Sequence, residues 1–158
     1  ITRIYEGTNG IQALDLVGRK LGMNGGRSVK RFFAMLQRYM EENPGAPFVT
    51  EVKDASSKLQ SATMWLMQQG MADGEQAGAA ATPYLRLFAL TAVAFFWSRM
   101  ALLAQQQLEA GTTETDFYQA KIHSGQFFVS RILPQASSLL AEIESGKDNL
   151  MAMTEAQF

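Results

Sequence analysis

The sequence predicts an all-α protein that folds as an antiparallel helical bundle. Apolar residues recur at spacings of three and four through almost every segment, which is the pattern of an amphipathic helix. Short stretches rich in glycine, asparagine and proline separate these segments, as expected for helices joined by tight loops. No alternating run of β-branched residues indicates a strand. We expect the bundle to extend from about residue 48 to residue 145.

Two helices are predicted before this bundle. The first spans about 9–21, with Thr8 as its N-terminal cap and Gly22 near its end. A turn at 24–26 leads to the second helix, which spans about 28–42. The second helix has an apolar stripe with helical spacing, formed by Val29, Phe32, Phe33, Leu36 and Met40.

The clearest boundary in the chain is the segment Asn-Pro-Gly-Ala-Pro at 43–47. The charge also changes there. Residues 1–44 hold seven Lys and Arg against four acids, whereas residues 45–158 hold seven against eleven. We therefore divide the chain into a first section, an additional helical domain and a loose tail, at residues 1–43, 48–146 and 147–158.

The third and fourth predicted helices form the middle of the chain. The third spans about 50–72 and carries an amphipathic pattern. Pro83 either starts or kinks the fourth, because proline suits the first turn of a helix and breaks its interior. The fourth helix then extends to about Ala110 and is apolar on most sides. It should be the central, most buried helix of the bundle.

The last two helices follow Gly111. Thr112 or Thr113 is expected to cap a helix that extends to about Leu133. Pro134 separates it from a final piece at 135–145, which Gly146 should stop.

Composition bounds the function. A net charge of −1 gives no case for a nucleic-acid partner, and the lack of cysteine excludes disulfides and thiol catalysis. The lack of cysteine is compatible with a cytoplasmic location. The longest apolar run, 88–97, is interrupted by Thr91 and is too short to span a bilayer, so we expect no membrane span. The acidic residues have no further metal-ligating residues at suitable spacing, so we expect no metal site. His123, the single histidine, is expected to be structural or on the surface.

The most informative segment is Ile4-Tyr5-Glu6-Gly7-Thr8-Asn9, followed by Gly10-Ile11-Gln12. Glu6 is a potential acid or base, and Gly7 has no Cβ that would keep a ligand away from the backbone. The start of the following helix offers free N–H groups to an anion. A capped helix with a nearby glutamate is nevertheless common in proteins, so these residues alone leave a purely structural role open.

This segment resembles the C-terminal signature of acyl-CoA dehydrogenases, the FAD enzymes that oxidise acyl-CoA thioesters to enoyl-CoA. The resemblance extends from Thr2 to about Lys20. It implies that Glu6 is the catalytic base, that Gly7 lies against the thioester, and that Thr8, Asn9, Gly10 and Gln12 lie near the flavin. It also implies an acyl-CoA substrate, an electron-transfer acceptor and a homo-oligomer.

The rest of the chain resembles the extra C-terminal helical domain of a subset of these enzymes, the methylmercaptopropionyl-CoA dehydrogenase-like members. The matching segments are Trp65-Leu66-Met67, 81–87, Asp116-Phe117-Tyr118 and Ala120-Lys121. Residues 1–43 are then the end of the dehydrogenase domain. Because the chain begins inside the motif, we expect it to be part of a longer enzyme and to be inactive alone.

Three alternatives stay open at this point. The helical domain could be an interaction or oligomerisation module that covers the active site and has no chemistry of its own. The basic first section could hold phosphates of FAD or CoA, or be a solvated helix face. Methionines with helical spacing, Met64, Met67 and Met71, could line an acyl pocket or pack in the core.

Overall fold

The computed structural model of the chain describes residues 7–150 and 152–157. Within them every regular element is helical, so the all-α prediction is confirmed. The first half holds α1 (Gly7–Asp15), the π-helical segment η1 (Leu16–Lys20), α2 (Met23–Glu42), α3 (Val49–Trp65) and the π-helical η2 (Leu66–Gly70). The second half holds α4 (Gly74–Glu109), α5 (Thr115–Phe127), π-helical η3 (Phe128–Ile132), α6 (Gln135–Glu144) and a 3-10 turn, η4 (Glu155–Gln157).

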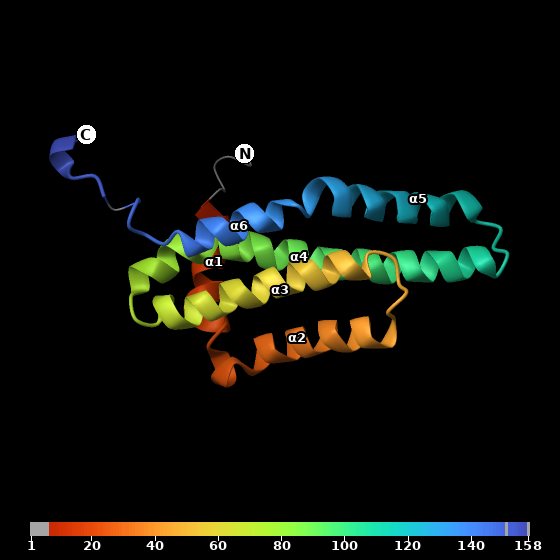
Figure 1. The fold of residues 1–158 in the computed structure, drawn as a ribbon, viewed down its shortest axis with the longest axis horizontal. Helices are drawn as coiled ribbons and strands as arrows, with labels where there is room; N and C mark the ends of the chain where they lie inside the picture. Colours follow the sequence, from red (N-terminus) through yellow and green to blue (C-terminus); the bar gives the residue numbers. More distant parts are fainter. Residues whose placement is uncertain (1–6, 151, 158) are drawn as a thin grey trace.

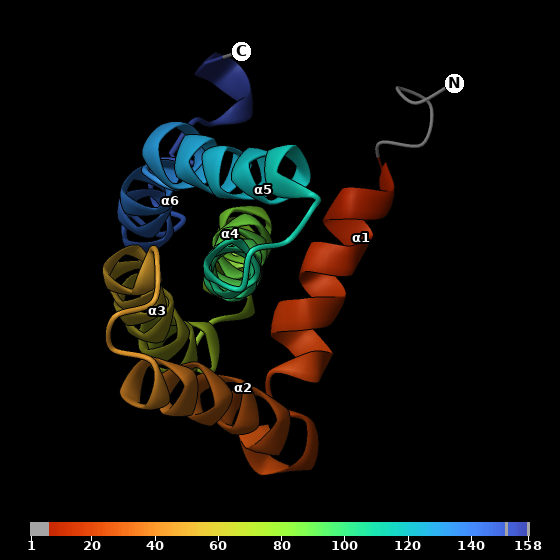
Figure 2. The same cartoon turned by 90° about the vertical axis from the view of Figure 1, so that its right-hand side faces the viewer.

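Helix α4 is the centre of the molecule. Figure 2 looks almost along its axis and shows α5, α6, α3 and α2 arranged around it, with α1 on the remaining side. In Figure 1 helices α2 to α6 follow the long axis of the protein, whereas α1 crosses them steeply. Helices α1, α3, α5 and α6 each contact α4 more than they contact any other helix. The predicted antiparallel helical bundle, with α4 at its core, is therefore confirmed.

Aromatic side chains join α2 to α4. The rings of Phe32 and Phe88 stack with centroids 4.7 Å apart, and Tyr39 meets Phe95 edge to face at 5.2 Å. These rings bury apolar surface between the helices, which is the main favourable term in folding. Leu36 of α2 is fully buried. Contacts thus extend across residues 43–47, while the division of the chain into domains there stays a prediction.

A partly buried chain of hydrogen bonds fixes the end of the α2–α3 connection. The hydroxyl of Ser98 on α4 donates to the carbonyl of Pro47, with 2.5 Å between the oxygens. Its proton is then committed, so the hydroxyl of Tyr39 donates to Ser98 Oγ at 2.9 Å. A buried hydroxyl without a partner would be costly, and here each one has a partner.

The predicted turns agree with the backbone. Asn24, Gly25 and Gly26 have φ of 55°, 66° and 72°, so regular helix begins only after Gly26, close to the predicted Ser28. Gly146 has φ of 67° directly after α6, which is the left-handed conformation that ends many helices. Both the turn and this helix stop are confirmed.

Three predicted helix starts are wrong. Helix α1 begins at Gly7, so Thr8 lies inside its first turn and is not its cap. Helix α4 begins at Gly74, where Asp73 Oδ1 accepts from the amide of Glu75 at 2.9 Å, an N-cap that precedes Pro83. Pro83 is buried inside α4, where its fixed φ suits the helix and only one amide donor is lost.

The third wrong start concerns α5, which begins at Thr115 with Glu114 as its N-cap residue. Neither predicted threonine occupies the cap position. Thr112 Oγ1 instead accepts from the amide of Glu114 at 3.2 Å and so shapes the turn that leads into the helix.

Helix α4 is, among the described residues, the one helix long and apolar enough to cross a membrane by length and composition. The central helix of a bundle meets the same criteria, and Tyr84, Leu87 and Phe95 of α4 are buried in the core. The sequence-based prediction considered only the apolar run 88–97, and the length of α4 corrects it. That no segment spans a membrane stays a prediction.

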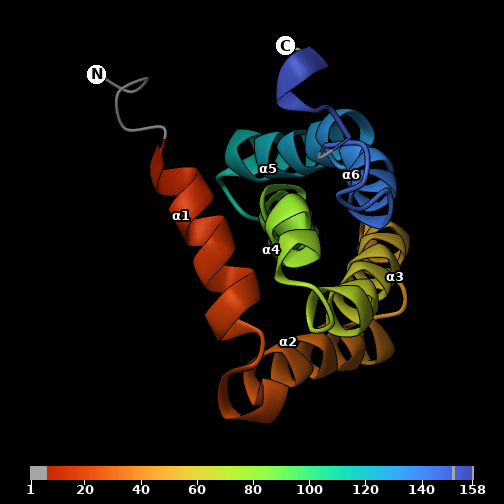
Figure 3. The same cartoon turned by 90° about the vertical axis from the view of Figure 1, so that its left-hand side faces the viewer.

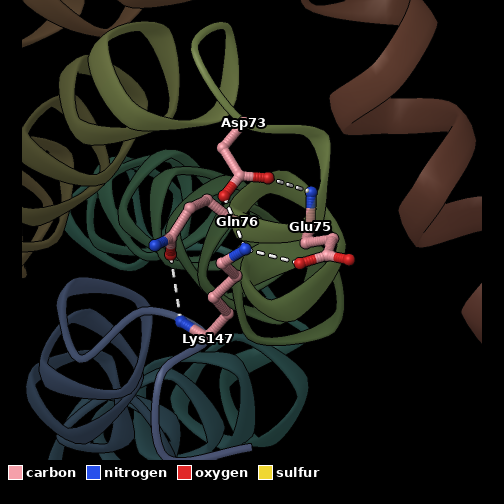
Figure 4. A network of polar contacts seen from close by, with 4 residues as sticks. All are labelled: Asp73, Glu75, Gln76 and Lys147. Atoms are coloured by element: carbon pink, nitrogen blue, oxygen red, sulfur yellow. Dashed lines mark hydrogen bonds and ion pairs between the residues drawn. The ribbon is translucent and has the colours of Figure 1, made fainter. Parts of the chain in front are cut away.

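Lys147 ties the end of α6 to the start of α4 (Figure 4). Its Nζ lies 2.7 Å from Asp73 Oδ2 and 2.5 Å from Glu75 Oε2, and its amide donates to Gln76 Oε1 at 3.0 Å. The ammonium group lowers the pKa of Asp73, and the two carboxylates raise the pKa of Lys147. Lys147 is thus anchored, although the loose tail predicted at 147–158 stays a prediction.

We expect Lys147→Met to lower the thermal midpoint in a pH-dependent way. The folded pKa of Asp73 is below its ordinary 3.8, so its contribution is present above that pH and is lost as pH falls through the folded value. The folded pKa of Lys147 is above 10.5, so its contribution is lost as pH rises beyond that value. The difference between wild type and variant should be largest between these limits.

Calorimetry from acid to alkaline pH, at low and high salt, measures that difference. Salt should reduce it, because the groups are exposed to solvent. A difference that stays constant with pH and salt would mean that only the aliphatic stem of Lys147 matters.

Candidate functional site

The residues of the motif lie at the start of α1. Glu6 is outside the described residues, and Gly7 is the first residue of the helix. Thr8, Asn9, Gly10 and Gln12 follow on the first turns and are all exposed. The structure therefore brings the last four together on one helix end, while the roles that the resemblance gives them stay predictions.

The start of α1 is open to a ligand. A Cβ at Gly10 would meet no atom within 4 Å, so another molecule can approach the backbone there. The first amide groups of a helix have no partner within the helix and carry a partial positive charge. Polar side chains of Thr8 and Gln12 add hydrogen-bonding groups. This end of α1 can form one edge of a site for a polar or anionic ligand.

The opposite side of α1 holds the helix on the bundle. Ala13 is fully buried, and Leu16, Val17 and Leu21 pack against the core. Asp15 pairs with Arg19 and Lys20, whose hydrogen bonds lower its pKa to about 2. Because one face of α1 is fixed in this way, the motif residues one to two turns earlier are held away from the core.

A cavity of about 460 Å³ lies between the end of α1, η1, η2 and the start of α4, and none of the motif residues lines it. Two of its walls are π-helical segments, which in proteins are frequent at functional sites because the wider turn displaces side chains. Its lining is mostly apolar and rich in glycine. It consists of Leu14, Val17, Gly18, Leu21, Gly22, Val29, Thr63, Leu66, Met67, Gly70, Met71, Gly74, Ala77 and Gly78.

One polar group faces this apolar lining. Thr63 donates its hydroxyl proton to the carbonyl of Leu59 at 2.7 Å, so Tyr84 donates its own to Thr63 Oγ1 at 2.8 Å. Burial raises the pKa of Tyr84 to about 12, while the contact with Thr63 works in the opposite direction. Tyr84 therefore stays neutral at physiological pH and acts as a structural donor.

Sequence reasoning missed most of this cavity. Gly70, Gly74 and Gly78 recur every four residues, and this spacing was the available signal. Met67 and Met71 line the cavity and are 54% and 82% exposed, and Met64 is 60% exposed. The core-packing interpretation of these three methionines is therefore wrong.

The remaining candidates carry no further site. His123 is exposed on α5, in agreement with a surface position. Phe95 and Phe128 are buried, whereas Phe96 and Phe127 are about half exposed. Within the described residues no group of three or more acids and histidines could hold a metal ion.

Comparison with known proteins adds the decisive observation. The family described as acetyl-CoA dehydrogenase C-terminal like matches residues 32–154, from the middle of α2 to the C-terminal segment. The chain belongs to this family. The resemblance to acyl-CoA dehydrogenases that the sequence carries is thereby confirmed.

Three curated relatives are similar to this acetyl-CoA dehydrogenase C-terminal-like chain, and two of them match it over its full length, which includes the motif. It is 31% identical over 156 residues to 3-methylmercaptopropionyl-CoA dehydrogenase of Ruegeria pomeroyi. The aligned residues cover 96% of this chain and 26% of the relative. It is 27% identical to a broad-specificity linear acyl-CoA dehydrogenase of Mycobacterium tuberculosis, over 100% of this chain and 28% of the relative. A butyryl-CoA dehydrogenase of Syntrophomonas wolfei is 26% identical, over 100% and 27%. The chain thus spans about a quarter of the length of these relatives.

Proposed function

We propose that this chain is the C-terminal part of an FAD-dependent acyl-CoA dehydrogenase that oxidises acyl-CoA to enoyl-CoA. The observation that supports it is similarity along the whole chain, motif included, to enzymes named as acyl-CoA dehydrogenases. The location would be cytoplasmic. The partners would be an acyl-CoA substrate, an electron-transfer acceptor and further copies of the enzyme.

In this proposal Glu6 is the general base. The α-proton of a thioester is weakly acidic, and a carboxylate can take it when hydrogen bonds stabilise the developing enolate. Gly7 would let the thioester lie against the backbone, because a side chain there would displace the α-carbon. A misplacement of about 1 Å can slow such a step about a hundredfold.

The exposed start of α1 fits a flavin as one edge of its site. Thr8, Asn9 and Gln12 supply donors and acceptors, and the open space at Gly10 permits close approach. When bound, FAD supplies the acceptor for the β-hydrogen and its electron pair. The proton of the α-carbon remains on Glu6, so both hydrogens of the oxidised bond have a destination.

We expect the 158-residue chain alone to bind no FAD and to oxidise no acyl-CoA. It offers a single edge of the flavin site, whereas a cofactor of this size needs most of its surface enclosed. The measurement is the absorption spectrum of the purified chain after incubation with FAD and gel filtration, followed by dye reduction with acyl-CoA. The longer protein that contains these residues is the matched control, and it should be yellow and active.

Two results would contradict the proposal. A chain that retains flavin or reduces the dye by itself would show that the site lies within these 158 residues. A longer protein that is colourless and does not reduce the dye, although folded, would show that the family likeness persists without the activity.

The alternative of an interaction module has an observation of its own in its favour. A line of large apolar side chains on α4 is exposed, although α4 is the central helix. The chain can be both the C-terminal part of the enzyme and a module that covers its active site. In the longer protein, this line of side chains is where the module and the rest of the enzyme would meet.

A further inference from the structure

Helix α4 exposes four large apolar side chains in one line, which we call the α4 seam. Val93, Phe96, Met100 and Leu103 are 40%, 51%, 40% and 53% exposed. Their spacings of three, four and three place them on one side of a helix with 3.6 residues per turn. This is the spacing with which an apolar side of one helix packs against another helix.

Four helices cover the other sides of α4, so we place the exposed seam on the side where α1 stands. Figures 2 and 3 show α5, α6, α3 and α2 around the other sides of α4 and only α1 on this one. Helix α1 crosses α4 near the first turns of α4. Leu14 near the end of α1 and Leu21 after η1 line the same cavity as Ala77 and Gly78 of α4. Among the described residues, the side of α4 beyond this crossing has no neighbouring helix.

The surroundings of the seam are those of a buried contact. From residue 89 to residue 103 the single charged residue is Arg99, whose guanidinium lies over the ring of Phe95, 5.4 Å from its centroid. A solvated helix face ordinarily carries charged and polar residues. The composition therefore indicates that the seam is covered in the functional protein.

The size of the seam indicates what covers it. Four side chains of this kind, each about half exposed, present on the order of 300–400 Å² of apolar surface. A stable dimer buries about 800 Å² on each partner, so the seam alone is too small for a second copy. A segment of the same polypeptide needs less area, because its effective concentration is already in the range of about 1 mM.

We propose that the α4 seam is the docking site of an apolar helix of the same polypeptide, from the part that precedes residue 1 in the longer enzyme. This inference rests on the proposed function for the existence of that part. The relatives are about four times as long as the chain, which matches 26–28% of them. The preceding part would join the chain at α1, on the side where the seam lies (Figure 3). Ile11 and Leu14 of α1, 66% and 54% exposed, add apolar surface on that helix.

Photo-cross-linking in the longer protein tests the docking. Phe96 is replaced by p-benzoylphenylalanine, and the control carries the same residue at Ser138, exposed on α6 on the far side of α4 from α1. After irradiation, gel electrophoresis and mass spectrometry identify the product. We expect position 96 to link to a peptide that precedes residue 1 without doubling the mass, and position 138 to give no such product.

Other outcomes would overturn the proposal. A product of doubled mass from position 96 would make a second copy the occupant. A lack of any product at position 96 would show that the seam is free, and equal yield at both positions would show that the contact is not specific to the seam.

The test is independent of the chemistry. It needs neither FAD nor acyl-CoA, so a longer protein without dehydrogenase activity would still report on the docking. Repeating it with Glu6→Gln separates the two questions, because this change should slow the reaction by a factor of about 10² to 10⁴ and leave the cross-link at position 96 unchanged.

Discussion

Replacing Glu6 with glutamine in the longer protein is expected to slow flavin reduction by acyl-CoA by a factor of about 10² to 10⁴, the range typical of losing a general base. Glutamine keeps the size and much of the hydrogen bonding of the side chain but accepts no proton at neutral pH. Flavin content and folding should therefore persist, and substrate binding should weaken much less than the rate. Anaerobic bleaching of the flavin on mixing with acyl-CoA measures the step.

Asp15→Asn provides the matched control for this prediction. Asp15 is a carboxylate on the same helix, but Arg19 and Lys20 already occupy it, and its side chain packs toward η1. Its removal should leave the bleaching rate near that of the wild type. If Glu6→Gln bleaches as fast as wild type, Glu6 is not the base, and the likeness at residues 4–9 is structural inheritance.

Helix identity and order were predictable because local pattern and tertiary packing agree over most of the chain. The apolar stripe of α2 faces α4 and α3, the glycine-rich turn at 24–26 has the positive φ that glycine favours, and Gly146 ends α6. The start of α4 was not predictable by the same reasoning. Pro83 is a strong signal for a first turn, yet the Asp73 cap and the contacts of the alanine-rich segment outweigh the loss of one hydrogen bond.

The site was predictable only as a list of residues. The motif gave Thr8, Asn9, Gly10 and Gln12, and the structure adds that they share the exposed end of α1. The cavity beyond the end of α1 depends on two π-helical segments, and no residue pattern specifies where a helix widens by one residue. It also depends on how steeply α1 crosses α4, which is a property of packing between distant segments.

Helix α1 connects the motif with the bundle. Its first turns carry the motif, and its last residues form a wall of the cavity and pack on the bundle. Any force that shifts the bundle against α1 would therefore move the motif.

Two neighbouring phenylalanines on α4 should differ sharply in their effect on stability. Phe95 is 2% exposed and packs against Tyr39, so Phe95→Ala leaves a cavity in the core and should lower the free energy of unfolding by about 3–5 kcal/mol. Phe96 is 51% exposed, and Phe96→Ala should change it by about 0.5 kcal/mol or less in the 158-residue chain. Urea unfolding followed by circular dichroism measures both.

The same pair distinguishes an uncovered seam from a covered one when it is measured in the longer protein. Phe95 has the same neighbours there, so its effect should carry over. Phe96 would be buried by the docked helix, and Phe96→Ala should then cost a substantial part of what Phe95→Ala costs, because it too leaves a cavity. An effect of Phe96→Ala as small in the longer protein as in the chain would mean that nothing packs on the seam. A small effect of Phe95→Ala in the chain would mean that α2 and α4 do not pack as the structure has them.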